Sequence, residues 1–300
     1  MVRPRSRRLA VHPPARPMIV AHRGASSTTA EHTLDAYVSA IESGADALEC
    51  DVRMTRDGHL VCVHDRTVNR TSDGRGVVSE FDLQGLNTLD FASWHSEVPR
   101  SADQLLNDLP YLAGVAPDRV ATGGGVLTLE VLLGLVRDAS REVRLLIETK
   151  HPTRYGGLVE KELVDMLQRF GWAGQPPAVP SVKLMANPDN PVIVMSFAPL
   201  ALRRIKLQAP AIPTVLLLDR LLPVRRDAGL PGGVTIAGPG LRVLRGDPEY
   251  VARAHARGYQ VYAWTVDEPS DVEYVLDLGV DTIITNRPGE VIAQLGSASA

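Results

Sequence analysis

The chain has 300 residues, 44% of them hydrophobic, which suffices for one large core or two small ones. Its formal net charge of −3 excludes the bulk basic footprint of a typical nucleic-acid-binding protein. No run approaches the roughly 18 uninterrupted apolar residues of a membrane-spanning helix, so no membrane span is expected.

The first 17 residues differ from the rest in being basic and rich in proline. The adjacent Arg7 and Arg8 suggest a twin-arginine export signal, but the apolar run after them is short and is broken by Pro13 and Pro14. We therefore predict that residues 1–17 are a disordered arm. A single domain is expected to occupy residues 18–295.

This domain begins with a short apolar strand, Met18 to Ala21, which ends in His22-Arg23-Gly24. Glu31-His32-Thr33 then opens a segment in which apolar residues recur at helical spacing until a terminating glycine, Gly44. A second strand is expected over residues 45–52, with Glu49 and Asp51 on one face. Strand, helix and strand in this order form a right-handed βαβ unit, which gathers functional groups at the carboxyl ends of its strands.

Asp57-Gly58 predicts a two-residue hairpin turn between the second strand and a returning arm that ends at His64-Asp65. In that register Asp51 lies opposite His64, with Cβ atoms about 5 Å apart. The same register sends the two cysteines of the chain, Cys50 and Cys62, to opposite faces. Both thiols are then expected to be free, which is typical of a cytoplasmic protein.

Residues 66–126 have weak periodicity and many turn residues, and we interpret them as an insertion into the main fold. A short helix is predicted at Gln104–Leu112. Trp94 and His95 are candidates for a substrate entrance, although an aromatic residue that anchors the insertion is the commoner arrangement.

Regular structure resumes at Leu127, and helices then alternate with strands to the end of the chain. Setting the returning arm aside, the strands are predicted to begin near residues 18, 46, 143, 192, 214, 234, 260 and 281. This alternation predicts an α/β protein with a closed parallel (β/α)8 barrel, the TIM barrel. An open doubly wound sheet is the alternative, but it does not bring together the polar strand ends that are spread through the chain.

Four short motifs in order resemble those of the glycerophosphodiester phosphodiesterase family: His22-Arg23-Gly24, Glu31-His32-Thr33, Glu49-Cys50-Asp51 and His64-Asp65. The resemblance covers about residues 18–290. It includes further matches at residues 147–150, 196–197, 263–265 and 279–281. It implies the same barrel fold and an enzyme of lipid and glycerol metabolism.

Three carboxylates, Glu49, Asp51 and Glu148, form an all-oxygen set of candidate metal ligands. Such a set selects a hard cation, Mg²⁺ or Ca²⁺, which polarises a phosphoryl oxygen. Arg23 and Lys150 are positively charged donors for the remaining phosphate oxygens. Two further residues complete the predicted set: Trp264 at the substrate and Glu31 in a supporting position.

His22 and His64 suit general acid–base catalysis because the ordinary pKa of histidine lies near working pH. The family resemblance implies these roles for the pair but not which histidine is the base. Two positions depart from the family pattern: His32 stands where asparagine is usual, and Asn286 where aspartate is common. We expect neither to contact the acid, the base or the metal ligands.

Together these features predict a metal-dependent hydrolase that converts glycerophosphodiesters, such as glycerophosphocholine and glycerophosphoethanolamine, to sn-glycerol 3-phosphate and an alcohol. One alternative is a lysophospholipase D-type activity on acylated substrates, which an apolar groove formed by the insertion would favour. Another is a catalytically silent barrel that binds phosphate esters. The sequence does not determine the oligomeric state.

Overall fold

The computed structural model describes residues 16–95, 124–174, 177–182, 185–221 and 226–298. Nearly all of the predicted N-terminal arm and the helix predicted at Gln104–Leu112 lie outside these residues. At the edge of the arm, Arg16 Nη2 forms a 2.7 Å ion pair with Asp46 Oδ1 at the bottom of the barrel.

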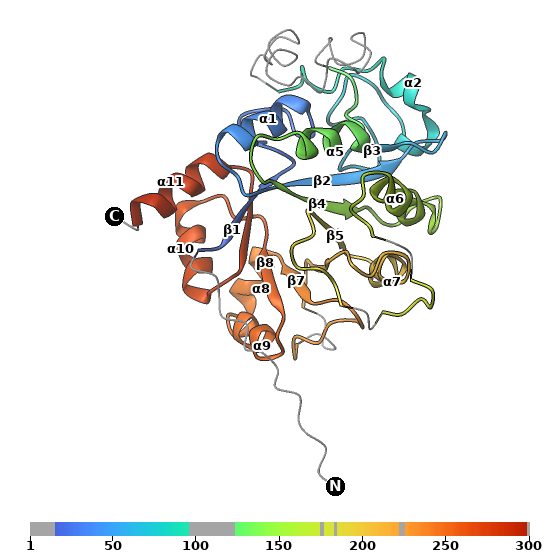
Figure 1. Ribbon diagram of the computed structural model, residues 1–300. Helices are drawn as coiled ribbons and strands as arrows, with labels where there is room; N and C mark the ends of the chain where they lie inside the picture. The colour runs from blue at the N-terminus through green and yellow to red at the C-terminus, as the bar shows by residue number, and fades with distance from the viewer. Residues whose placement is uncertain (1–15, 96–123, 175–176, 183–184, 222–225, 299–300) are drawn as a thin grey trace.

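Eight parallel strands form the centre of the molecule (Figure 1). β1 pairs with β9 on one side and with β2 on the other, and this closes the sheet into the predicted barrel. The strands are β1 (Met18–His22), β2 (Ala47–Met54), β4 (Arg144–Thr149), β5 (Val192–Ser196), β6 (Thr214–Leu218), β7 (Ile236–Pro239), β8 (Gln260–Ala263) and β9 (Thr282–Thr285).

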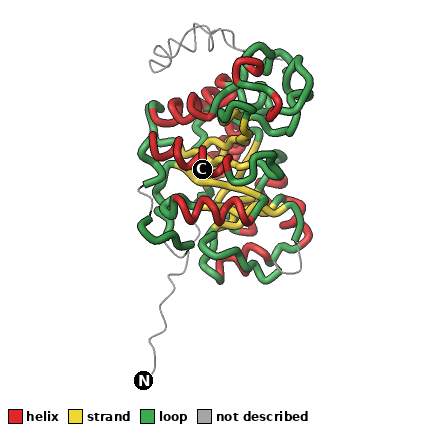
Figure 2. Tube along the Cα trace, turned by 90° about the vertical axis from the view of Figure 1, so that its right-hand side faces the viewer, coloured by secondary structure: helices red, strands yellow, loops and turns green. Residues whose placement is uncertain are grey.

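Helices surround the barrel, as the red segments around the yellow strands show in Figure 2. They are α1 (Leu34–Glu42), α5 (Leu129–Arg137), α6 (Leu158–Arg169), α7 (Pro199–Gln208), α8 (Leu241–Gly246), α9 (Tyr250–Ala256), α10 (Pro269–Leu278) and α11 (Pro288–Ala298). Thr33 and Thr128 cap α1 and α5 by accepting from backbone N–H groups of the first turn. We did not predict α8 or α11; α8 has only six residues, too few for a clear periodic signal.

The apolar core has two layers because the strands are covered on both faces. Inside the barrel, Val20, Leu146, Ile193 and Val215 belong to one buried cluster. Outside it, the strands pack against the helices through two larger clusters. This rigid frame fixes the strand ends that hold the site. In the part of the chain that the structure describes, no helix is both long and apolar enough to cross a membrane.

The hairpin register differs by one residue from the prediction. β3 (Leu60–Cys62) pairs with β2 through Val52–Cys62 and Met54–Leu60, and Val63 N donates to Asp51 O at 3.0 Å. The loop has three residues rather than two, and its last residue, Gly58, has φ +93°. Val63, not His64, is therefore the partner of Asp51.

This change of register brings the two cysteines to the same face of the hairpin, because a slip of one residue reverses the side on which every side chain lies. Cys50 and Cys62 are both buried, and their side chains contact each other. The prediction that they point apart is wrong, whereas the prediction that both thiols are free is confirmed.

The described part of the insertion packs above β2 and β3 (Figure 1). It contains η1 (Val78–Glu80) and α2 (Leu83–Leu86), and a small apolar cluster that includes Val68, Leu86 and Phe91 holds it to the hairpin. Trp94 Nε1 donates to Phe91 O at 2.8 Å. The bond lies within one segment and the side chain is 40% exposed, so it does not decide between an anchor and an entrance.

Candidate active site

Most of the predicted site residues lie at or just after the carboxyl ends of three adjacent strands, β1, β2 and β4, whereas Trp264 follows β8 and His64 follows the hairpin. The parallel register places His22 of β1 beside Glu49 of β2, and Asp51 beside Glu148 of β4. Glu49, Asp51 and Glu148 project to the same side because alternate residues of a strand share a face. Residues that are about 100 positions apart in sequence therefore meet at one end of the barrel.

Glu49, Asp51 and Glu148 form a compact carboxylate cluster with one ligand atom from each within 4.8 Å of the others. The three are 1%, 1% and 6% exposed. Burial, followed by the charge of Asp51, raises the pKa of Glu49 well above its usual range and that of Glu148 to about 7. Bringing three acids together in this way is unfavourable unless positive charge compensates them.

Lys150 and Arg23 supply part of that charge. Lys150 Nζ lies 2.9 Å from Asp51 Oδ1 and 2.8 Å from Glu148 Oε1. Arg23 N donates to Glu49 Oε2 at 3.0 Å. Burial alone favours a protonated Asp51, but Lys150, His32 and Arg23 outweigh burial and hold its pKa well below the usual range.

The loop after β1 aims Arg23 at this cluster. Arg23 has φ +59°, and the next residue, Gly24, has φ +85°. A Cβ at Gly24 would lie 2.6 Å from the backbone of Ala36 in α1, so only glycine permits this close packing. Arg23 Nε lies 3.1 Å from Asp51 Oδ2 but is buried without a hydrogen bond to it or to another described residue.

His22 is held from the last strand of the barrel. Its Nδ1 donates at 2.7 Å to Asn286 Oδ1, and Asn286 Nδ2 donates to Asp267 Oδ2 at 2.6 Å. Ser26 Oγ donates to the carbonyl of His22 at 2.7 Å. Burial, followed by the charge of Arg23, lowers the pKa of His22 to about 4. The ring is therefore neutral near pH 7, with Nε2 unprotonated.

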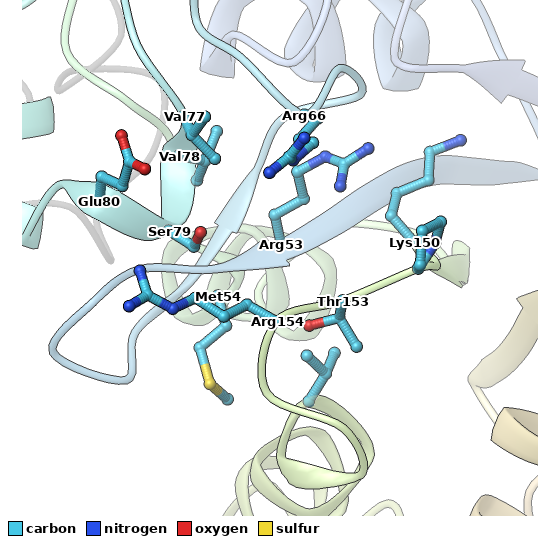
Figure 3. A pocket seen from close by; sticks show the side chains of 12 residues that line it. Arg53, Met54, Arg66, Val77, Val78, Ser79, Glu80, Lys150, Thr153 and Arg154 are labelled. Carbon is cyan, nitrogen blue, oxygen red and sulfur yellow. The ribbon is translucent and has the colours of Figure 1, made fainter.

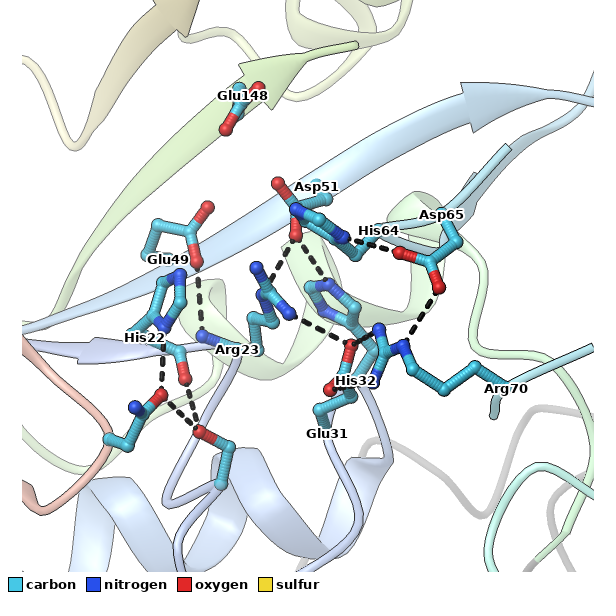
Figure 4. A network of polar contacts seen from close by, with 12 residues as sticks. His22, Arg23, Glu31, His32, Glu49, Asp51, His64, Asp65, Arg70 and Glu148 are labelled. Atoms are coloured by element: carbon cyan, nitrogen blue, oxygen red, sulfur yellow. Dashed lines mark hydrogen bonds and ion pairs between the residues drawn. The ribbon is translucent and has the colours of Figure 1, made fainter. Parts of the chain in front are cut away.

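His64 is held by a chain of charged groups. Its Nδ1 donates to Asp65 Oδ1 at 2.7 Å, and Arg70 Nε donates to Asp65 Oδ2 at 2.7 Å. Arg70 also forms two 2.8 Å bonds to Glu31, which accepts from Arg23 Nη1 at 3.1 Å (Figure 4). The bond from Arg70 lowers the pKa of Asp65 to about 2, so Asp65 stays ionised.

A pocket of about 270 Å³ lies over these groups. His22, Arg23, His64 and Lys150 line one part of it together with two of the carboxylates, Glu49 and Glu148. The opposite part is apolar, and there Trp264 meets Phe197 edge-on with ring centroids 5.5 Å apart. The Trp264 Nε1–H is satisfied by Gly238 O at 2.6 Å, so the indole offers the pocket its apolar surface.

The profile of the glycerophosphoryl diester phosphodiesterase family matches residues 22–290. The probable glycerophosphodiester phosphodiesterase 1 of Mycobacterium tuberculosis is 42% identical over 285 residues, which cover 95% of this chain and 94% of that protein. The chain belongs to this family. It is an enzyme of the phosphoric diester hydrolase class.

Other family members agree over most of their length. The glycerophosphodiester phosphodiesterase of Bacillus subtilis is 33% identical over 281 residues, which cover 92% of this chain and 85% of that protein. An Oleispira antarctica phosphodiesterase structure superposes with a TM-score of 0.72 at 21% identity, covering 93% of this chain and 97% of the other. This last similarity concerns the fold alone.

The two positions that depart from the family pattern both contact the site, and the prediction that they do not is wrong. His32 is buried with φ +59°, and its Nε2 lies 2.9 Å from Asp51 Oδ2 while Nδ1 lies 2.7 Å from the Tyr37 hydroxyl. Asn286 holds His22, as described above. The departures from the family pattern were the signal that could have indicated these contacts, since His32 lies within a family motif.

Other supporting residues carried no signal in the sequence. Asp267 and Arg70 belong to loops without a motif, and only the closed barrel and the docked insertion bring them to the two histidines. Asp65 was recognised as part of His64-Asp65 but was assigned no role.

Proposed function

We propose that this enzyme hydrolyses small glycerophosphodiesters, such as glycerophosphocholine and glycerophosphoethanolamine, to sn-glycerol 3-phosphate and an alcohol. The observation that carries the proposal is one pocket in which two of three clustered buried carboxylates, two cationic side chains and two histidines face an apolar wall. Its volume of about 270 Å³ is small for a ligand site, which suits a deacylated substrate. The Oleispira antarctica phosphodiesterase binds the product sn-glycerol-3-phosphate, which supports the same product here.

Glu49, Asp51 and Glu148 are the proposed ligands of a divalent cation, Mg²⁺ or Ca²⁺. Their donor set fits, because three carboxylates offer only oxygen atoms and their burial disfavours the charged state unless a cation compensates it. When bound, such an ion polarises a phosphoryl oxygen and neutralises developing charge. Family members depend on divalent metals in general.

His22 is proposed as the general base. Its Nδ1–H is committed to the amide oxygen of Asn286, which leaves Nε2 as the unprotonated ring nitrogen. The lowered pKa agrees with a neutral ring whose Nε2 accepts a proton from the nucleophile.

His64 is proposed as the general acid. Burial, Lys150 and Arg23 lower the pKa of His64, but its Nδ1 bonds an ionised carboxylate, Asp65, which raises that pKa and stabilises an imidazolium more than an amide does. His64 then protonates the oxygen of the leaving alcohol as the phosphorus–oxygen bond breaks. The unequal partners of the two histidines support this assignment of the roles.

Arg23 and Lys150 are proposed to bind the remaining phosphate oxygens, with Trp264 packing against the apolar part of the substrate and Glu31 fixing Arg23. The groove between the described part of the insertion and the loop after β4 has a mixed lining that includes three arginines. Among the described residues, this groove does not favour an acylated substrate. The buried free thiols agree with a cytoplasmic location, which remains a prediction.

The deciding experiment measures release of sn-glycerol 3-phosphate from glycerophosphocholine, glycerophosphoethanolamine and lysophosphatidylcholine, each with Mg²⁺, Ca²⁺ or excess chelator. We expect both deacylated substrates to be cleaved with a cation and neither with chelator. Glu49→Gln, Asp51→Asn and Glu148→Gln should each weaken metal binding in calorimetric titrations, whereas Glu130→Gln on the exposed face of α5 should not. Full turnover in excess chelator contradicts the metal proposal.

A further inference from the structure

A second and larger groove lies beside the catalytic pocket. It has a volume of about 600 Å³, and Lys150 lines both. The insertion forms one wall and the loop after β4 forms the other (Figure 3). Its lining includes Arg53, Arg66, Ser79, Glu80, Thr153 and Arg154.

The groove carries an excess of positive charge. Four of its twelve lining residues are cationic, and one, Glu80, is acidic. Among the described residues, neither Arg66 nor Arg154 donates to a carboxylate or any other side chain, whereas nearby Arg56 and Arg70 form ion pairs of 2.6 Å and 2.7 Å. Two exposed guanidinium groups therefore face the groove with their donors available.

Hydrogen bonds between the walls and on the floor fix the shape of this groove. The Tyr155 hydroxyl of one wall donates to Ser79 O of the other at 2.9 Å, which ties the walls together. On the floor, Arg53 donates to the carbonyl of His64 through Nε at 3.0 Å and Nη2 at 2.7 Å. Arg53 and Arg66 lie beside each other, and their positive charges repel (Figure 3). The groove thus adjoins the active site at His64, the proposed acid.

We propose that this groove binds a second phosphate group, carried by the leaving alcohol of the substrate. Because His64 protonates that alcohol, the alcohol leaves on the side where the groove begins. Arg66 and Arg154 are the proposed ligands of this phosphate, since guanidinium groups match phosphate oxygens in geometry and charge. The inference rests on the proposed function and adds a preference within its substrate class: diesters with an anionic alcohol are cleaved more efficiently than those with a cationic head group such as choline, which the same arginines repel.

The test compares glycerophosphoinositol 4-phosphate with glycerophosphoinositol, which lacks the second phosphate. We expect the wild type to have a kcat/KM about tenfold or more higher for the phosphorylated substrate, as charge-assisted hydrogen bonds provide. The double variant Arg66→Gln/Arg154→Gln should lose this preference, mainly through KM, and keep its kcat/KM for glycerophosphoinositol within about twofold. The matched control Arg75→Gln/Arg203→Gln removes two exposed positive charges that do not line the groove and should keep the preference.

An equal kcat/KM for the two substrates in the wild type overturns the proposal, as does a preference that survives in the double variant. If the wild type cleaves neither these substrates nor glycerophosphocholine, the proposed function fails instead. The groove is then tested by calorimetric binding of the same two diesters. Tighter binding of the phosphorylated one by the wild type alone supports the groove, and equal binding rejects it.

Discussion

The two histidines lie in the same part of the pocket, on either flank of Glu49 and Asp51 (Figure 4), and different parts of the molecule hold them. His22 ends β1 and is held by Asn286, just after β9, so the closure of the barrel creates its partner. His64 follows the hairpin and is held by Asp65, the next residue, which the insertion fixes through Arg70. One side depends on the rigid strands, and the other on a segment added to them.

The chemical nature of the partner differs as well. Burial and the charge of Arg23 lower the pKa of His22 to about 4. Burial also lowers the pKa of His64, but there the ionised carboxylates of Asp51 and Asp65 oppose it. In the proposed mechanism, this difference in surroundings makes the same residue type the base at His22 and the acid at His64. The predictions below test this contrast.

The largest effect is expected from the histidines themselves. His22→Ala and His64→Ala should each lower turnover of glycerophosphocholine by about 10²–10⁴-fold, with little change in affinity for a non-hydrolysable diester. A p-nitrophenyl leaving group needs no protonation, so His64→Ala should regain most of its rate with that substrate and His22→Ala should not. Rescue of His22→Ala instead would reverse the assigned roles. Near-normal turnover in both variants would reject the mechanism.

Replacing the hydrogen-bond partners of the two histidines should lower turnover less than replacing the histidines themselves. Asp65→Asn and Asn286→Ala should each lower kcat by about 10–100-fold, the usual range for residues that support a functional ligand. The p-nitrophenyl substrate again separates the sides, because Asp65→Asn should recover on it and Asn286→Ala should not. Equal recovery of both variants would argue that the two sides do not divide acid and base.

A smaller effect is expected at His32, which bonds Asp51, a proposed metal ligand, rather than either of the two histidines of the pocket. His32→Ala should weaken metal affinity by about tenfold in calorimetric titration. His32→Asn restores the residue usual in the family and should retain most of the affinity. The same titration on Tyr37→Phe removes the other partner of the ring and should give an intermediate loss. An unchanged titration in His32→Ala would assign the residue a purely structural role.

The smallest effect is a shift in the pH profile. The base must be neutral and the acid charged, so kcat/KM should follow a bell whose acid limb reports His22, with its pKa lowered to about 4. Asn286→Asp puts a negative charge beside His22, raises its pKa and should move the acid limb to higher pH. Asp65→Asn removes a charge beside His64, lowers its pKa and should move the basic limb to lower pH. Opposite shifts, or none, would contradict the assignment.

The sequence alone was sufficient to predict the barrel and to name the candidate residues at the centre of the site. The predicted strands Thr214–Leu218 and Gln260–Ala263 coincide with β6 and β8. A strand buried on both faces consists mainly of apolar residues, so it can be recognised from its own short sequence. The candidate residues were found because the motifs around His22, Glu49 and His64 are also local. Their roles remain to be tested by the experiments above.

Only the tertiary structure determined how these local segments contact one another. The register of the hairpin depends on whether its loop has two or three residues, and Asp57-Gly58 does not determine this. The observed three-residue loop places Cys50 and Cys62 on the same face instead of on opposite faces. The partners of the histidines were equally hidden. Asn286 reaches His22 across 264 positions only because β9 closes on β1, and Arg70 reaches Asp65 only because the insertion folds back over the hairpin. Contacts of this kind leave no periodic pattern in a sequence, since they arise when separate elements pack.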